Sequence, residues 1–293
     1  MATSTPAPQP GTAAAAFDKA SEVYERLTGG CTRELAAYLL TLEPRVSPSS
    51  IILDNACGTG ILTSEILSEG QSSHEAKHKP KPRIFAADLA PSMVSNFMAR
   101  AQENGWLGGD GEDGDDKLSI SVMDAGALTY PDDTFTHSYT NLGFPFFPDG
   151  EKAAAHMYRT LKPGGTAFIT TWKGLGYLPH IQRAQLAVRP DSVPWETPMP
   201  KEWYTKGKLE GVLKAGGFKE DKIQVQTKKV GYRGTDVEDL VDIMKQGFLG
   251  QVTSGWSEEE KEHWVKELKG GLSSEEKTTA CVEMVAWVAI AHK

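Results

Sequence analysis

The chain has 293 residues, a net charge of −8 at pH 7 and a pI of about 5.5. This length allows one elaborated domain or two small ones, and an acidic chain without a basic stripe argues against a nucleic-acid partner. Three scattered cysteines form no metal-ligand spacing and fit a reducing cytosol, and no apolar run is long enough to span a bilayer. We therefore expect a cytoplasmic protein with no metal site and no membrane segment.

The N-terminal region divides into a tail and a pair of helices. Residues 1–16 are rich in Ala and Pro and contain no Lys or Arg, so they lack the charged start of a signal peptide and are predicted to be disordered. Residues 17–42 have apolar side chains at helical spacing, interrupted by Gly29 and Gly30. We expect one domain over residues 17–293, with N-terminal helices over residues 17–45.

The most informative segment is Ile51 to Leu62. Three apolar residues are followed by Asp54, Asn55, Ala56 and Cys57, then by the Gly58-Thr59-Gly60 turn and an apolar helix start. A strand, a glycine turn and a helix are the opening unit of a doubly wound nucleotide-binding sheet. A dinucleotide fingerprint needs a third glycine where this chain has Thr63, and a pyrophosphate would not favour a carboxylate at Asp54. A cationic ligand without phosphate suits the segment better.

In this segment the chain resembles the class I S-adenosylmethionine-dependent methyltransferases, whose first motif matches residues 54–60. The resemblance implies S-adenosylmethionine as cofactor and an α/β, doubly wound, seven-stranded, mostly parallel sheet. It is closest to the ubiquinone-biosynthesis C-methyltransferase group, and within it to fungal secondary-metabolite methyltransferases such as the gliotoxin bis-thiomethyltransferase.

Two further strands end in an acid. Residues 83–88 end at Asp88, where a doubly wound sheet places the ribose-binding acid, and Ala90-Pro91-Ser92-Met93 opens a helix. Residues 117–122 precede Asp124, which the resemblance implies holds the adenine amino group. A fourth strand over residues 135–142 ends at Asn141 and Leu142, where methyl group and acceptor should meet. The expected cofactor-binding residues are Tyr24, Thr28, Asp54, Asn55, Ala56, Gly58, Gly60, Asp88, Leu89, Met93, Asp124, Ala125, Asn141 and Leu142.

The second half of the chain combines a fifth strand with a cap. Residues 161–165 match the family's Leu-Lys-Pro-Gly-Gly turn, which precedes a strand over residues 166–172. Residues 173–201 contain five prolines and predict an irregular cap. Helices are expected over residues 203–215, 237–248 and 257–268, and strands over 222–230 and 282–291. The cap elements are assigned to residues 173–205 and 235–275.

The acceptor side has no clear catalytic group. Phe144, Phe147, Trp172, Tyr177 and His180 are the candidate substrate-contacting residues, and His180 is the candidate base. Phe146 and Trp195 are further candidates for the wall of this pocket, and the alternative for Phe146 and Phe147 is a place in the core. Since methyl transfer from a sulfonium is an in-line displacement, positioning in a dry site is expected to suffice.

These observations predict methyl transfer to a small hydrophobic molecule, at a thiol or a hydroxyl. The alternatives are an N- or C-methyltransferase of the same fold, and a regulatory protein that binds the cofactor without turnover. A nicotinamide dehydrogenase is disfavoured by Thr63 and Asp54. The oligomeric state does not follow from the sequence.

Overall fold

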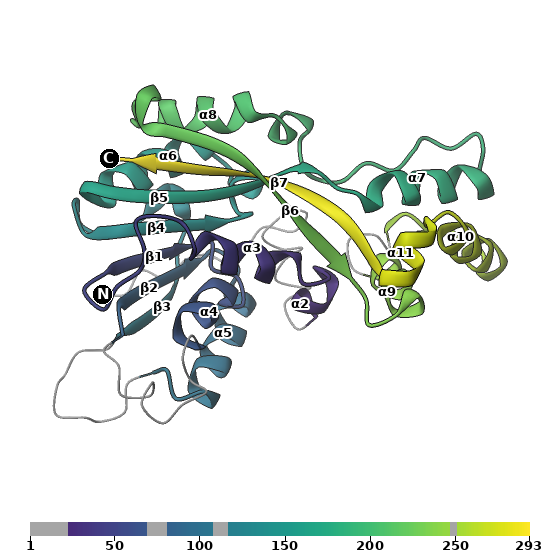
Figure 1. Ribbon diagram of the computed structural model, residues 1–293, viewed down its shortest axis with the longest axis horizontal. Coiled ribbons are helices and arrows are strands. Elements are labelled where there is room, and N and C mark those ends of the chain that lie inside the picture. The colour runs from purple at the N-terminus through teal and green to yellow at the C-terminus, as the bar shows by residue number, and fades with distance from the viewer. Residues whose placement is uncertain (1–22, 69–80, 108–116, 247–250) are drawn as a thin grey trace.

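The computed structural model describes residues 23–68, 81–107, 117–246 and 251–293. The tail expected over residues 1–16 lies outside these residues. Within them, seven strands form one sheet in the order β3-β2-β1-β4-β5-β7-β6 (Figure 1). The strands are β1 (Ile51–Asn55), β2 (Arg83–Asp88), β3 (Leu118–Val122), β4 (Phe135–Asn141), β5 (Leu161–Gly174), β6 (Ile223–Arg233) and β7 (Cys281–His292).

All strands except β7 run in one direction. β1 pairs in parallel with β2 and β4, β2 with β3, and β4 with β5, whereas β7 is antiparallel to both β5 and β6. The strand order reverses between β1 and β4, so the segments that follow these two strands pass to opposite faces of the sheet and leave a crevice outside their carboxyl ends. The expected doubly wound, seven-stranded, mostly parallel sheet is confirmed.

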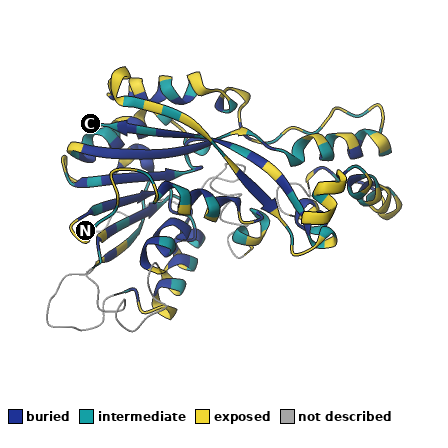
Figure 2. Cartoon of the chain, in the orientation of Figure 1, coloured by how far each residue is buried: buried dark blue, intermediate teal, exposed yellow. Residues whose placement is uncertain are grey.

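Helices cover both faces of the sheet, so the core has two layers of apolar side chains (Figure 2). Neighbouring strand residues point to opposite layers, as Ile52 and Leu53 do on β1. One layer packs against α3 (Cys31–Leu39), α4 (Ile61–Ser68) and α5 (Pro91–Glu103). The other packs against α6 (Gly150–Thr160) and α8 (Lys206–Ala215).

Strands β6 and β7 extend beyond β5 and carry a third apolar cluster. Their pairing continues to Arg233 and Cys281, whereas pairing of β5 with β7 ends at Gly174 and Val285. Four helices gather at this extended end (Figure 1): α7 (Tyr177–Val188), α9 (Val237–Lys245), α10 (Glu258–Gly270) and α11 (Ser274–Thr279). Buried side chains of α7, α9, α10, β6 and β7 form a separate core around Trp264, Leu240 and Met284. No helix among the described residues is long and apolar enough to cross a membrane.

The short helix α2 (Tyr24–Leu27) and α3 are docked on this extended end of β6. Gly29 and Gly30 separate the two helices and have positive φ angles of 53° and 79°. A Cβ atom at Gly29 would lie 2.8 Å from the Tyr232 ring, and Arg233 N donates to Gly29 O at 2.9 Å. The predicted glycine break is therefore both a turn and a point of close packing.

One expectation for the second half of the chain is wrong. Residues 177–188 are a regular helix, because Pro179 occupies its first turn, where no N–H is required, and Ile181, Ala184 and Gln185 are buried at helical spacing. Residues 161–165 are counted within β5, but pairing with β4 passes from Leu161 to Thr166, and Gly164 between them has the positive φ of 79° that the predicted turn requires. Helix α11 was not expected at all; it is a short, largely exposed helix with a Ser273–Glu276 capping box.

Candidate functional site: two adjoining cavities

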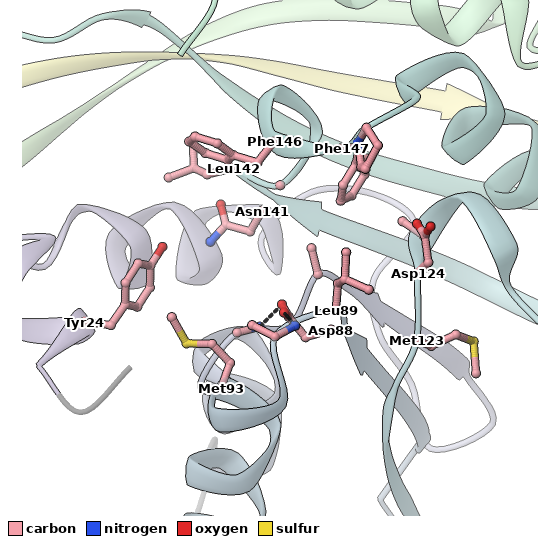
Figure 3. Close-up of a pocket in the computed structure, with 16 residues that line it drawn as sticks. Tyr24, Asp88, Leu89, Met93, Met123, Asp124, Asn141, Leu142, Phe146 and Phe147 are labelled. Carbon is pink, nitrogen blue, oxygen red and sulfur yellow. Dashed lines mark hydrogen bonds between the residues drawn. The ribbon is translucent and has the colours of Figure 1, made fainter. Parts of the chain in front are cut away.

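The carboxyl ends of β1, β2 and β4 enclose an open cavity of about 680 Å³, which we call the first cavity. Figure 3 places Tyr24 of α2 on one side of it, Asp124 and Phe147 on the other, and Asp88 between them. The lining residues are Tyr24, Ala56, Gly58, Asp88, Leu89, Ala90, Met93, Met123, Asp124, Ala125, Asn141, Leu142, Gly143, Phe146, Phe147 and Pro148. Ten of the fourteen residues expected at the cofactor are in this set.

Asp88 lies at the end of β2 and holds the glycine turn of β1. Its Oδ2 accepts a hydrogen bond from Gly58 N at 2.8 Å, and its Oδ1 accepts one from Ala90 N at 2.9 Å (Figure 3). A carboxylate has about four acceptor sites. These two bonds therefore orient the group and leave it able to accept from ligand hydroxyls.

The turn after β1 is shaped by unusual backbone angles. Ala56 and Leu142, at the ends of β1 and β4, have positive φ angles of 58° and 62°. Such angles cost a non-glycine residue of the order of 1–3 kcal/mol and cluster at functional sites. Gly58 also has a positive φ, and a Cβ atom there would meet nothing within 4 Å. The turn thus leaves space beside Gly58 that a ligand can approach closely.

Asp54 lies beneath this surface. It is 2% exposed and does not line the cavity, and its Oδ2 accepts from Thr63 Oγ1 at 2.7 Å and Thr63 N at 3.3 Å. Burial, followed by the Asp88 charge, raises the pKa of Asp54 to about 6, and the two Thr63 bonds limit the rise. Direct contact of Asp54 with a cationic ligand was the expectation; in the structure the carboxyl group instead holds the start of α4. Asn55 and Gly60 are likewise buried behind the turn, outside the lining.

The opposite side of the first cavity is apolar with one acid. Leu89, Met93, Met123 and Ala125 supply apolar surface, and Asp124 caps the following turn by accepting from Gly126 N at 2.8 Å. A flat heteroaromatic ring with an amino group fits such a wall. Asp88 and the open side of Gly58 border the same cavity, so it combines two acids, an apolar wall and a glycine turn that a ligand can approach closely.

A second open cavity, of about 920 Å³, adjoins the first and shares Tyr24, Leu142 and Phe146 with it. Its remaining lining residues are Leu27, Thr28, Cys31, Thr32, Trp172, Leu175, Tyr177, Trp195, Thr197, Pro198, Met199, Tyr232, Gln246 and Met284. None of these is an acid, a histidine, a lysine or an arginine. Its titratable groups are tyrosines and Cys31, and burial raises the pKa of each, that of Tyr24 to about 12.

The residues expected at the acceptor are not all at this cavity. Trp172 and Tyr177 line it, whereas Phe147 lines the first cavity. Phe144 lines neither; it is fully buried, with ring centroids 5.1 Å from Phe147 and 6.0 Å from Trp203. Its position directly after the strand end suggested the crevice, but the short 3-10 helix Phe144–Phe146 turns its ring into the core.

Two other assignments differ from the arrangement in the structure. His180 lines neither cavity, and its Nε2 lies 3.0 Å from Glu276 Oε1 on α11, so it joins two cap helices. Thr28, assigned to the cofactor, lines the second cavity. Among the described residues, no group of acids, histidines and cysteines could hold a metal ion.

Several residues that line the second cavity were not predicted from the sequence. Cys31 and Thr32 lie on α3, and Tyr232 and Met284 on the extended ends of β6 and β7. The sequence around each of these residues is typical of an ordinary buried position in a helix or strand. The one signal in the sequence was Gly29, because a glycine can mark a place where another element packs closely against the backbone. In the structure this element is β6, at Tyr232.

Comparison with known proteins agrees with this geometry. The methyltransferase domain family matches residues 53–169. Methyltransferase tpcH of Aspergillus fumigatus is 27% identical over 225 residues, covering 75% of this chain and 71% of that protein. Acetylaranotin bis-thiomethyltransferase of Aspergillus terreus is 25% identical over 264 residues, covering 87% and 84%. The ubiquinone/menaquinone biosynthesis C-methyltransferase UbiE of Hydrogenovibrio crunogenus is 32% identical over 125 residues, 42% of each chain.

Solved structures share the fold. The [4+2]-cyclase SpnF superposes with a TM-score of 0.57 at 16% identity, covering 99% of this chain and 98% of that chain. Phosphoethanolamine N-methyltransferase 2 of Haemonchus contortus, solved with phosphomonomethylethanolamine and S-adenosylhomocysteine, gives 0.53 at 19% identity, covering 94% and 57%. At these identities the likeness concerns the fold alone.

Proposed function

We propose that this chain, which belongs to the class I S-adenosylmethionine-dependent methyltransferases, methylates a small, uncharged, apolar molecule at a thiol or an acidic hydroxyl. Its methyl donor is S-adenosylmethionine. The observation that carries the proposal is the second cavity, which shares Tyr24, Leu142 and Phe146 with the first and has no charged lining residue among those described.

The apolar wall of the second cavity favours an uncharged acceptor. Burying an unpaired charge is costly, so a cavity with no counter-charge disfavours charged acceptors. Trp172, Tyr177 and Trp195 offer aromatic surface to a ring system. A small neutral molecule, rather than a nucleic acid, is the partner that fits this wall and the chain's acidic balance.

The titratable groups at this cavity bear on the acceptor atom. Bound S-adenosylmethionine supplies an electrophilic methyl group, and displacement at that carbon needs a nucleophile in line with the leaving sulfur. The described cavity residues Tyr24, Cys31, Tyr177 and Tyr232 have raised pKa values, so none is an ionised base at neutral pH. The acceptor must then be nucleophilic by itself. A thiol with a pKa of about 8.5 is partly ionised at neutral pH, whereas an aliphatic alcohol is not.

The residues at the junction contribute by positioning. Tyr24, Leu142 and Phe146 line both cavities, so they lie where the methyl group and the acceptor would meet. Holding reactants in line can supply on the order of 7–11 kcal/mol of the barrier reduction. The name of the Aspergillus terreus relative, a bis-thiomethyltransferase, supports sulfur as acceptor. Three free cysteines fit a reducing compartment such as the cytosol.

The test combines binding with turnover. Calorimetry with S-adenosylhomocysteine, and NADH as control, should give binding of the former alone. Labelled S-adenosylmethionine is then incubated with naphthylmethanethiol, naphthol, naphthylmethylamine and naphthylmethanol, which differ mainly in the acceptor group. We expect methylation of the thiol and the naphthol, with rates that rise with pH through the acceptor's own pKa. Methylation of the amine alone would favour an N-methyltransferase, and tight binding without any transfer would favour a regulatory protein.

A further inference from the structure

A chain of hydrogen bonds joins the walls of the two cavities. Thr170 Oγ1 on β5 donates to Asn141 Oδ1 at 2.7 Å, and Asn141 Nδ2 donates to the Thr32 carbonyl at 2.9 Å. Asn141, at the end of β4, lines the first cavity (Figure 3), and Thr32 of α3 lines the second. We call these three linked residues the strut. Thr170 lines neither cavity and is fully buried.

The Thr170 hydroxyl makes a second bond at the same place. Its Oγ1 accepts from Leu142 N at 2.9 Å, while the Thr170 carbonyl accepts from the same N–H at 3.2 Å. Leu142 has a positive φ of 62° and belongs to the wall that both cavities share. A single hydroxyl therefore orients the Asn141 amide and stabilises the strained backbone of Leu142.

Helix α3 is also held by other contacts: Ala36 and Leu39 pack in the apolar layer with α4, and Arg33 forms an ion pair with Glu65 of α4. Glu34 of α3 accepts from Gly231 N at 3.1 Å and from Arg233 Nη1 at 2.6 Å, which attaches the helix to β6. The Asn141 to Thr32 bond attaches it to β4, beside the first cavity. The strut is thus the polar attachment of α3 to β4 beside the first cavity, and it adds to the other contacts that set where Thr32 lies relative to the parallel part of the sheet.

We propose that Thr170 is a positioning residue that sets the spacing between the two cavities, and so the alignment of the acceptor with the methyl group. This inference rests on the proposed function. In-line transfer is sensitive to such alignment, and a misplacement of about 1 Å can cost about 100-fold in rate. Loss of the hydroxyl should therefore slow transfer more than it weakens binding of either ligand.

The chain supplies its own control. Thr170→Val removes the hydroxyl and keeps the shape, and Thr170→Ser keeps the hydroxyl. Thr171 is the next residue of β5 and is equally buried, but its Oγ1 has no hydrogen-bond partner among the described residues. Thr171→Val thus makes the same chemical change on the same strand without touching the strut.

Three quantities are measured on the full-length protein: single-turnover transfer to naphthylmethanethiol, calorimetric affinity for S-adenosylhomocysteine, and hydrogen–deuterium exchange of residues 31–39. For Thr170→Val we expect transfer at least about tenfold slower, affinity within about threefold of wild type, and faster exchange in α3. Thr170→Ser and Thr171→Val should resemble wild type in all three.

The proposal is overturned if Thr170→Val transfers within about twofold of wild type, if Thr171→Val loses as much, or if weaker cofactor-product binding accounts for the whole loss. Should Thr170→Val fail to fold, Thr170→Ala with Thr171→Ala as its control decides the same question. A wild-type protein that binds S-adenosylhomocysteine but methylates nothing would contradict the proposed function instead. The exchange and affinity measurements would then still decide the strut: unchanged exchange in α3 would overturn it.

Discussion

A hydrogen bond joins Gly58, in the turn after β1, to Asp88, at the end of β2: the Gly58 N–H donates to Asp88 Oδ2 at 2.8 Å. The residue expected to bind the ribose thus also fixes the glycine turn that faces the ligand. Because the same carboxylate accepts from Ala90 N as well, it is oriented before any ligand arrives. Such pre-organisation reduces the entropy cost of binding.

We expect Asp88→Ala to weaken S-adenosylmethionine binding by about 2 kcal/mol or more, since two charge-assisted hydrogen bonds to the ribose are lost. Calorimetric titration measures this, with thermal unfolding to confirm that the variant is folded. Exposed Asp221 is a matched control, and Asp221→Ala should bind as wild type does. Unchanged affinity in Asp88→Ala would mean that another residue holds the ribose.

We expect substitution of Gly58 and of Gly60 by alanine to have different effects, one mainly on ligand binding and the other mainly on stability. A Cβ atom at Gly60 would lie 2.3 Å from the fully buried Phe97 ring, and the φ of Gly60 is 79°. Overpacking costs about 1–3 kcal/mol and the left-handed backbone about 1–2 kcal/mol more, so Gly60→Ala should lower the free energy of unfolding by several kcal/mol.

At Gly58 the added methyl group meets open space, so only the backbone cost of about 1–2 kcal/mol applies to stability. The methyl group would instead intrude on the ligand, and we expect Gly58→Ala to weaken S-adenosylhomocysteine binding. Urea unfolding and calorimetry on both variants separate the two effects. Equal losses of stability in both would contradict the distinction.

The sheet could be predicted because each strand end carries a local signal. Polar side chains at the ends of strands, at Asn55, Asp88 and Asn141, mark the carboxyl edge, and the glycines after β1 mark the turn between strand and helix. The residues of the first cavity follow one after another from these strand ends. Most of them could therefore be named before the structure.

The second cavity could not be predicted in the same way, because its walls come from segments that meet only in three dimensions. Tyr232 and Met284 line it from β6 and β7, which extend beyond the rest of the sheet. Cys31 lines it from α3, which packs against these two strands. Helix α7 was not predicted because residues 173–201 contain five prolines, which indicated irregular structure. Pro179, however, lies in the first turn of α7, where proline is tolerated.

Asp54 should make stability depend on pH. Its pKa is raised from 3.8 to about 6, so the folded state holds the proton more tightly than the unfolded state. Stability contributed by this group is full below about pH 4 and is lost as pH rises to about 6, with a total of about 3 kcal/mol. Asp54→Asn has no such titration and can still accept a hydrogen bond from Thr63 through its amide oxygen.

The measurement is the free energy of unfolding of Asp54→Asn relative to wild type, at pH 4 and at pH 7.5. We expect the variant to gain up to about 3 kcal/mol relative to wild type between the two pH values. Asp221→Asn, at an exposed position, should not change its relative stability in this way. A difference between Asp54→Asn and wild type that is the same at both pH values would show that the carboxyl group is not perturbed.

His180 tests whether the enzyme works by positioning alone. It lines neither cavity and its Nε2 lies 3.0 Å from Glu276 Oε1, so its role in the structure is to join α7 to α11. We expect His180→Ala to keep the maximal rate within about tenfold of wild type, whereas losing a general base typically costs about 10²–10⁴-fold. Glu276→Ala removes the same contact from the other side, together with the bond from Ser273 N to Glu276 Oε2, and should have an equally small effect on the rate. If His180→Ala alone lost rate in the larger range, with S-adenosylhomocysteine binding intact, the histidine would have to reach the acceptor during turnover, and the cap would have to move to bring it there.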